Sequence, residues 1–369
     1  MNDQIRINWY RSKVDRQVMS ALMQSSDLRA FGQVLAQLGL YAVTGTLAYL
    51  AYRNLHAANW PGALPLLLLA LFAHGTNGSF FGGIACHELS HKTPFGHQVW
   101  NTFFLKVYAF LSWFDPLGYR LSHVRHHQVT VHADHDGEVV LPVGLDWYGV
   151  RFILKSLTFD PLALLRLLRF WVYAAFGRIG PDNFFKGTWL ARVLPESNAE
   201  LRREHRNWAR VILLGHLALA AVFIATGHWI LIVIFTFGCQ YCSWLTVLCG
   251  GPQHAGLSPN VADFRLCCRT YTCSWLPAFF YWNMQYHVEH HMFPAVPFYH
   301  LPRLRQAIAH DLPPAPHGLW ATWRELIPVL RRQRRDPNYV SVPPLPARPA
   351  GPADQVDVQT LGLEASRAV

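Results

Sequence analysis

The chain has 369 residues, of which 51% are hydrophobic and only 15% are charged, and its formal net charge at pH 7 is +10. Soluble domains carry roughly 25% charged residues, so this composition excludes an ordinary soluble globular protein. The basic charge comes without a recognisable nucleic-acid-binding module, which excludes nucleic acid as a partner and favours anionic lipid headgroups.

The first predicted elements are two transmembrane helices. After an expected cytosolic N-terminal segment at 1–30, Arg53 is the only charged residue before the first histidine pair, and it divides the apolar stretch 31–86. A helix needs about 20 apolar residues to cross a bilayer. We therefore predict spans near 31–52 and 61–86, joined as a hairpin with a short outer turn.

A second hairpin is predicted further along the chain. The segment 156–176 is apolar but broken by arginines, and it predicts a helix at the membrane interface rather than a span. Residues 211–262 then contain no charged side chain at all. A Thr-Gly-His turn divides the apolar part into spans near 211–225 and 229–250, which makes four predicted spans in total.

The remaining elements and the topology follow from charge. Residues 31–310 are expected to form the membrane domain, 311–335 a basic amphipathic segment against headgroups, and 336–369 a loose tail rich in Pro and Ala. Arg53 is the only Lys or Arg within the two hairpins. Because cytoplasmic loops of membrane proteins carry the excess of Lys and Arg, both termini and the region between the hairpins are predicted to be cytoplasmic.

Nine of the 20 histidines are grouped with a regular spacing. The first two are four residues apart, two later groups both read H-x2-H-H, and a ninth histidine directly follows the fourth predicted span. On a helix, residues i, i+3 and i+4 share one face, so each group projects its rings in one direction. The nine are His87, His91, His123, His126, His127, His254, His287, His290 and His291.

The predicted topology places all nine on one side of the membrane. His87 follows the second span and His254 follows the fourth, so two complete crossings separate His127 from His254. An odd number of spans would have divided the groups between the two sides. The sequence therefore predicts that they converge on one site at the cytoplasmic membrane surface.

Nine imidazoles exceed what one metal needs, since a zinc site takes four ligands and a catalytic one takes three plus water. Two metals with four or five nitrogen ligands each would use them all, and Fe, Cu, Zn and Ni all accept such ligands. His87, Glu88 and His91 also spell the H-E-x-x-H signature of zinc proteases. That alternative, a membrane zinc metalloprotease, leaves seven grouped histidines without a role.

The other histidines are expected to be ordinary core or surface residues. They include His74, His97, His132, His135 and His300.

The order and spacing of the histidine groups resemble those of the membrane fatty acid desaturase superfamily. The stretch WNMQYHVEHHMFPAVPFYHLPRL (282–304) is especially similar to its bacterial members, and the resemblance covers roughly residues 30–310. It implies an all-α integral membrane fold with four transmembrane helices and a cytosolic helical cap. The cap would carry two non-haem irons held by the nine histidines.

The resemblance also implies the partners of the reaction. O2 would be the co-substrate, the substrate a fatty acid or membrane lipid, and the electron donor a separate ferredoxin, rubredoxin or cytochrome b5 type protein. The implied location is the bacterial inner membrane, with the active site cytoplasmic. Desaturation is the commonest outcome in the superfamily, and oxidative decarboxylation of a free fatty acid to a terminal alkene, or hydroxylation, are alternatives.

Within this interpretation, carboxylates near the histidines would orient the imidazoles through their second ring nitrogen. Glu88 and Glu289 are the first candidates. Asp134, Asp136 and Asp263 could do the same or could be solvated carboxylates.

A free fatty acid would also need cations to hold its carboxylate near the metals. The candidates next to the histidine groups are Arg120, Arg125, Arg265 and Arg269. Their alternative role is contact with lipid headgroups or salt bridges within the cap.

Overall fold

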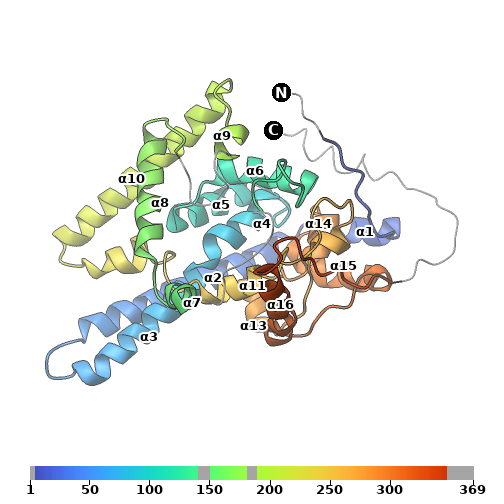
Figure 1. The fold of residues 1–369 in the computed structure, drawn as a ribbon. Helices are drawn as coiled ribbons and strands as arrows, with labels where there is room; N and C mark the ends of the chain where they lie inside the picture. Colours follow the sequence, from blue (N-terminus) through green and yellow to red (C-terminus); the bar gives the residue numbers. More distant parts are fainter. Residues whose placement is uncertain (1–4, 140–149, 181–188, 347–369) are drawn as a thin grey trace.

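The computed structural model describes residues 5–139, 150–180 and 189–346. Over these residues the protein is built from helices, with three isolated β-bridges and no named strand, so the all-α prediction is confirmed (Figure 1). The predicted tail at 336–369 falls largely outside the described residues; its described part, 336–346, contains no helix.

The first hairpin forms as predicted. Helix α2 (Asp27–Arg53) begins where the Ser26 hydroxyl accepts from the Arg29 N–H, and it is joined by a short turn to the antiparallel helix α3 (Trp60–Gly78) (Figure 1). The chain continues through a π-helical turn, η1 (Phe81–Ala85), into α4 (Cys86–Ser90). Two helical stretches therefore result, Asp27–Arg53 and Trp60–Ser90, and both are long and apolar enough to cross a membrane.

A third helix of membrane length is α10 (Ala199–Ala225). It contains the predicted span at 211–225 and begins twelve residues earlier, because the polar segment before the span is also helical. Large apolar side chains on its surface, such as Leu214 and Leu217, are exposed, as are Leu66 and Leu69 on α3. Exposed apolar side chains of this extent suit contact with lipid.

The fourth predicted span is not one continuous helix. Residues 229–250 form a short π-helical segment η2 (Ile232–Thr236), an irregular stretch at 237–243, and the helix α11 (Trp244–Gly250). Side chains of other helices bind carbonyls that the break leaves free: His74 Nε2 lies 2.9 Å from the Ile234 oxygen, and Trp113 Nε1 donates to the Thr236 oxygen at 2.7 Å. In the described residues three helices have the length of a span, so the four-span topology stays a prediction.

The predicted interfacial helix at 156–176 is divided in two. Helix α7 (Val150–Leu157) ends before Asp160, whose carboxylate accepts from the N–H groups of Leu162 and Ala163 and so caps α8 (Pro161–Ala175). Proline at the first position of α8 suits the start of a helix and not its interior. Helix α8 packs beside α10 (Figure 1).

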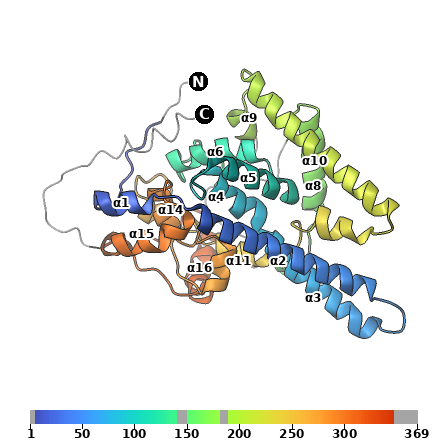
Figure 2. The ribbon, with the colours of Figure 1, turned by 180° about the vertical axis from the view of Figure 1, so that it is seen from behind.

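The helices α1 (Arg16–Leu22), α14 (His287–Met292), α15 (Leu301–Ile308) and α16 (Leu319–Gln333) lie at the end of the molecule remote from the α2–α3 turn (Figure 2). Among them, α16 contains Pro328, buries Leu326 and Leu330, and exposes Arg331 and Arg332. It lies within the segment 311–335, whose contact with headgroups stays a prediction. The other helices in the described residues are α5 (Gln98–Ser112), α6 (Pro116–Val129), α9 (Trp189–Val193), α12 (Phe264–Cys267), α13 (Trp275–Phe280), η3 (Phe298–His300) and η4 (Ala309–Asp311).

Candidate metal centre

The nine grouped histidines come from four places in the fold. His87 lies on α4, which continues the helix that begins at Trp60, and His91 follows at its C-terminal end. The second group lies on α6, which starts where the Asp115 side chain accepts from the Gly118 N–H. The lone His254 follows α11, and the third group lies on the buried helix α14.

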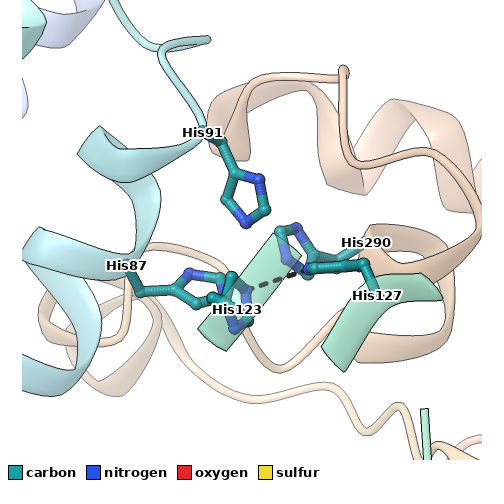
Figure 3. Close-up of side chains that lie close together, drawn as sticks. All are labelled: His87, His91, His123, His127 and His290. Carbon is teal, nitrogen blue, oxygen red and sulfur yellow. Dashed lines mark hydrogen bonds between the residues drawn. The ribbon is translucent and has the colours of Figure 1, made fainter. Parts of the chain in front are cut away.

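Five of these side chains form what we call the first cluster. Their potential ligand atoms all lie within 4.8 Å of one another, and the rings point toward one common space (Figure 3). Within it, His123 Nε2 and His127 Nε2 are 2.9 Å apart. The five are His87, His91, His123, His127 and His290.

The other four form the second cluster. The ligand atoms of His126, His254 and His291 lie within 4.8 Å of one another. His287 joins them, because its Nε2 is 3.0 Å from Nε2 of His254 and 3.1 Å from Nε2 of His291. The histidines that are far apart in the sequence are thus brought together in two neighbouring groups.

The second ring nitrogens show which way several imidazoles direct their lone pairs. His254 Nδ1 lies 2.8 Å from the Cys267 carbonyl oxygen, which can only accept, so Nδ1 carries the proton. Thr130 Oγ1 donates to the His126 carbonyl and therefore accepts from His291 Nδ1 at 3.2 Å. In both rings Nε2 keeps its lone pair, and both lone pairs face His287 Nε2.

Two carboxylates hold further rings in the same tautomer. His123 Nδ1 is 2.9 Å from Glu138 Oε2, and His126 Nδ1 is 2.7 Å from Asp136 Oδ2. Asp136 is itself held by the N–H groups of Val131 and Glu138. Carboxylates in this position orient metal-binding imidazoles and raise their basicity.

Burial keeps most of these rings neutral, which is the form that binds metal. It lowers the pKa of His91 to about 3 and that of His254 to about 3, and it holds the pKa of His123 well below the usual range. Burial also acts to lower the pKa of His126, but the charge and hydrogen bond of Asp136 together with the charge of Glu138 raise it above its usual value.

These neutral rings fit a pair of bound metal ions. Buried polar atoms are normally hydrogen-bonded, yet His91 Nε2 and both ring nitrogens of His290 have no hydrogen-bond partner. Donor atoms at right angles around a metal at about 2.1 Å lie about 3.0 Å apart, which is the separation of the paired Nε2 atoms. A cation in each cluster would satisfy the convergent lone pairs.

Of the two glutamates proposed from the sequence, only Glu88 lies against the histidines. Its Oε1 is 2.9 Å from His87 Nδ1 and 3.8 Å from His290 Nδ1. The expectation for Glu289 is not supported, because its carboxylate accepts from Thr270 Oγ1 at 2.5 Å and from Arg305 Nη1 at 2.7 Å. Glu289 thereby ties α14 to α15 and orients no imidazole.

Of the three aspartates proposed from the sequence, one contacts a histidine ring of the clusters and two do not. Asp136 contacts His126, as described above, whereas Asp134 is exposed. Asp263 forms a salt bridge with Arg265 at 2.8 Å. Glu138 was not among the proposed residues, although it follows Asp136 by two positions and contacts His123.

Two of the four candidate head-group cations are occupied by protein groups. Arg265 forms ion pairs with Asp263 and with Asp311. Arg269 Nη1 donates to the carbonyls of Pro252 and Ala255, on either side of His254, so it holds the His254 loop. Neither Arg265 nor Arg269 therefore has a guanidinium that is free to bind a substrate carboxylate.

The other two candidate cations, Arg120 and Arg125, lie half-buried on α6. For these two the head-group role stays a prediction.

Several of the other histidines have partners outside the two clusters. His74 is buried and contacts Thr44 and the Ile234 carbonyl; the exposed His97 contacts Asp27. His300 Nδ1 lies 2.7 Å from the Leu22 carbonyl oxygen. His132 Nδ1 contacts the Thr130 carbonyl. His135 is half-buried.

Comparison with known proteins agrees with this geometry. The model of the fatty acid desaturase family matches residues 58–323, which include all nine grouped histidines. Among curated proteins, none matches the chain. The family match extends over more than half of the chain, so this protein belongs to the fatty acid desaturase family.

Proposed function

We propose that this protein is a membrane-bound, O2-dependent oxidoreductase that uses two non-haem irons to desaturate a fatty acid or fatty acyl chain. The observation that carries the proposal is the presence of two adjacent, buried clusters of imidazole donors in a member of the fatty acid desaturase family. Abstraction of hydrogen from an unactivated C–H bond needs an oxidant that no side chain supplies, and a bound metal centre supplies it.

The two clusters divide the ligands between the metals. We propose that the first cluster holds one iron and the second cluster, with four rings, holds the other. Glu138, Asp136 and the Cys267 carbonyl would keep the Nε2 lone pairs directed at the metals. Iron in place of zinc or copper is part of the proposal, because imidazole donors accept all three.

The position of the clusters suits a substrate that comes from the bilayer. His87 lies near the end of the apolar helical stretch Trp60–Ser90, so the first cluster adjoins a helix of membrane length. Most of the nine rings are buried, which limits the access of water and would protect a reactive centre from side reactions. We propose that the site faces the cytoplasm at the bacterial inner membrane, where a separate electron-transfer protein would reach it.

The contacts of the arginines bear on the alternative reactions. Decarboxylation of a free acid needs a cation near the metals, and Arg265 and Arg269 are both bound to other protein groups. Two of the four candidate cations thus already hold parts of the protein together. This favours desaturation, which leaves the head group outside the site, over decarboxylation to a terminal alkene.

Product analysis tests the reaction. The purified protein is supplied with O2, a reduced ferredoxin, and a saturated chain as the free acid or as a thioester, and the products are separated by gas chromatography with mass detection. We expect an internal double bond at unchanged chain length. A 1-alkene one carbon shorter would establish decarboxylation instead, and a hydroxylated chain would establish hydroxylation.

A further inference from the structure

The N-terminal arm, defined here as residues 5–15, crosses the side of the metal centre formed by the segment after His254. Tyr10 forms a β-bridge with Asp263, and its N–H donates to the Ala262 carbonyl at 2.9 Å. The Trp9 ring lies flat on the Phe264 ring, with centroids 4.0 Å apart and planes 9° from parallel. The arm is therefore fixed to the short helix α12.

The same stacked pair reaches a ligand of the second cluster. The Phe264 ring is fully buried, and its centroid lies 5.5 Å from that of His291. Trp9 thus packs against the residue that packs against His291. Because a buried ring cannot move without its neighbours in a close-packed interior, removal of the Trp9 ring would free Phe264 and, through it, His291.

Two further contacts join the arm to helices that carry the histidines. Trp9 Nε1 donates to the Gln128 carbonyl at 2.8 Å, near the end of α6. The buried Ser12 Oγ also lies 3.5 Å from Sδ of Met292, which directly follows His291 on α14. The arm therefore contacts all three segments that supply the second cluster: α6, the segment after His254, and α14.

A partly buried network of charged and hydroxyl groups anchors the arm in this position. Tyr10 Oη and Ser12 Oγ both lie within hydrogen-bond distance of Asp311 Oδ2, at 2.8 and 2.6 Å. Asp311 Oδ1 pairs with Arg265 at 2.6 Å, and the Arg265 guanidinium lies 3.8 Å from the centre of the Tyr10 ring. A loosely attached terminus would not have its hydroxyl groups paired in this way.

We infer that the N-terminal arm is part of the metal centre, with Trp9 as a positioning residue that holds His291 and the second cluster ready to bind metal. The inference rests on the proposed diiron function. Two ligands of the first cluster, His87 and His91, come from the end of the membrane-length helix and not from the segments that the arm ties together. Loss of the arm contacts should therefore affect the second metal more than the first.

Metal content tests this role without any activity assay. In protein purified from iron-supplied cells, Trp9→Ala should lower iron from about two to about one per chain, and Trp9→Phe should restore it because the stack is kept. Trp320→Ala is the matched control, since Trp320 is 81% exposed on α16; it should keep the wild-type content. Size-exclusion chromatography shows whether each variant is folded.

The outcomes separate this inference from the proposed function. Wild-type iron content in a folded Trp9→Ala variant would overturn the role of the arm and leave the diiron proposal intact. A wild-type protein without iron would overturn both. If Trp9→Ala does not fold, the Ser12→Ala variant is the test. A chelator should remove one iron from this variant several-fold faster than from the wild-type protein. An unchanged rate of iron loss would overturn the inference.

Discussion

Replacing His254 with alanine is expected to remove one of two irons, so that the content falls from about two to about one per chain. His254 Nδ1 is fixed by the Cys267 carbonyl, and its Nε2 lone pair faces His287 in the second cluster. Without this ring the second cluster keeps three imidazoles and an open side. The activity should fall with the iron, because the proposed chemistry needs both metals.

The control is another buried histidine. His300 is also buried and hydrogen-bonded, but its partners are the Leu22 carbonyl and Arg29, outside both clusters. Iron analysis of folded His300→Ala should therefore give the wild-type value. Equal iron contents in the His254→Ala and His300→Ala variants would show that His254 has only a structural role.

Asp136→Asn is expected to weaken metal binding by about 10- to 100-fold, which is the usual effect of losing a carboxylate behind a ligating imidazole. Asp136 accepts from His126 Nδ1 and from the Val131 N–H through one oxygen. An amide carries no charge, and its NH2 group could donate to Nδ1 instead. The proton of His126 would then move to Nε2 and block the lone pair that should face the metal.

The matched control for Asp136→Asn is Asp134→Asn, two residues earlier in the chain. Asp134 is exposed and has a positive φ of 64°, a conformation that asparagine tolerates well. Competition with a chelator should give wild-type iron affinity for Asp134→Asn and a reduced affinity for Asp136→Asn. If the two variants bind iron equally, the contact between Asp136 and His126 has no part in metal binding.

The histidine pattern could be predicted from the sequence because its spacing is a local property of helices. Residues i, i+3 and i+4 share a face wherever a helix forms, and α6 and α14 are helical over the second and third groups. His254 was recognised by its place after an apolar stretch. His254 lies in the second cluster although the apolar stretch before it is not one helix.

The carboxylates around the site could not be assigned from the sequence to the same degree. Glu289 stands among the histidines of α14, but two positions along a helix turn a side chain by about 200° from His287, so it faces Thr270 and Arg305. Glu138 reaches His123 only because the chain folds back after α6. Such contacts depend on tertiary structure, which sequence spacing does not encode.

The interruption of the fourth apolar stretch also depends on contacts between residues that are remote in the sequence. The absence of charge predicts that residues 229–250 lie in the membrane, but it does not show that they form one helix. The break is stabilised by partners that are remote in sequence, such as His74 and Trp113, which bind the Ile234 and Thr236 carbonyls. Where neighbouring side chains satisfy the free backbone groups, a non-helical segment is tolerated at membrane depth.

If the two clusters hold two irons, the metal content of the wild-type protein will show it without any assay of activity. Protein purified from iron-supplied cells is analysed by inductively coupled plasma mass spectrometry against its chain concentration. Two clusters of four and five imidazoles predict about two irons per chain, both removed by a chelator together with the activity. One zinc per chain with no iron would overturn the diiron proposal.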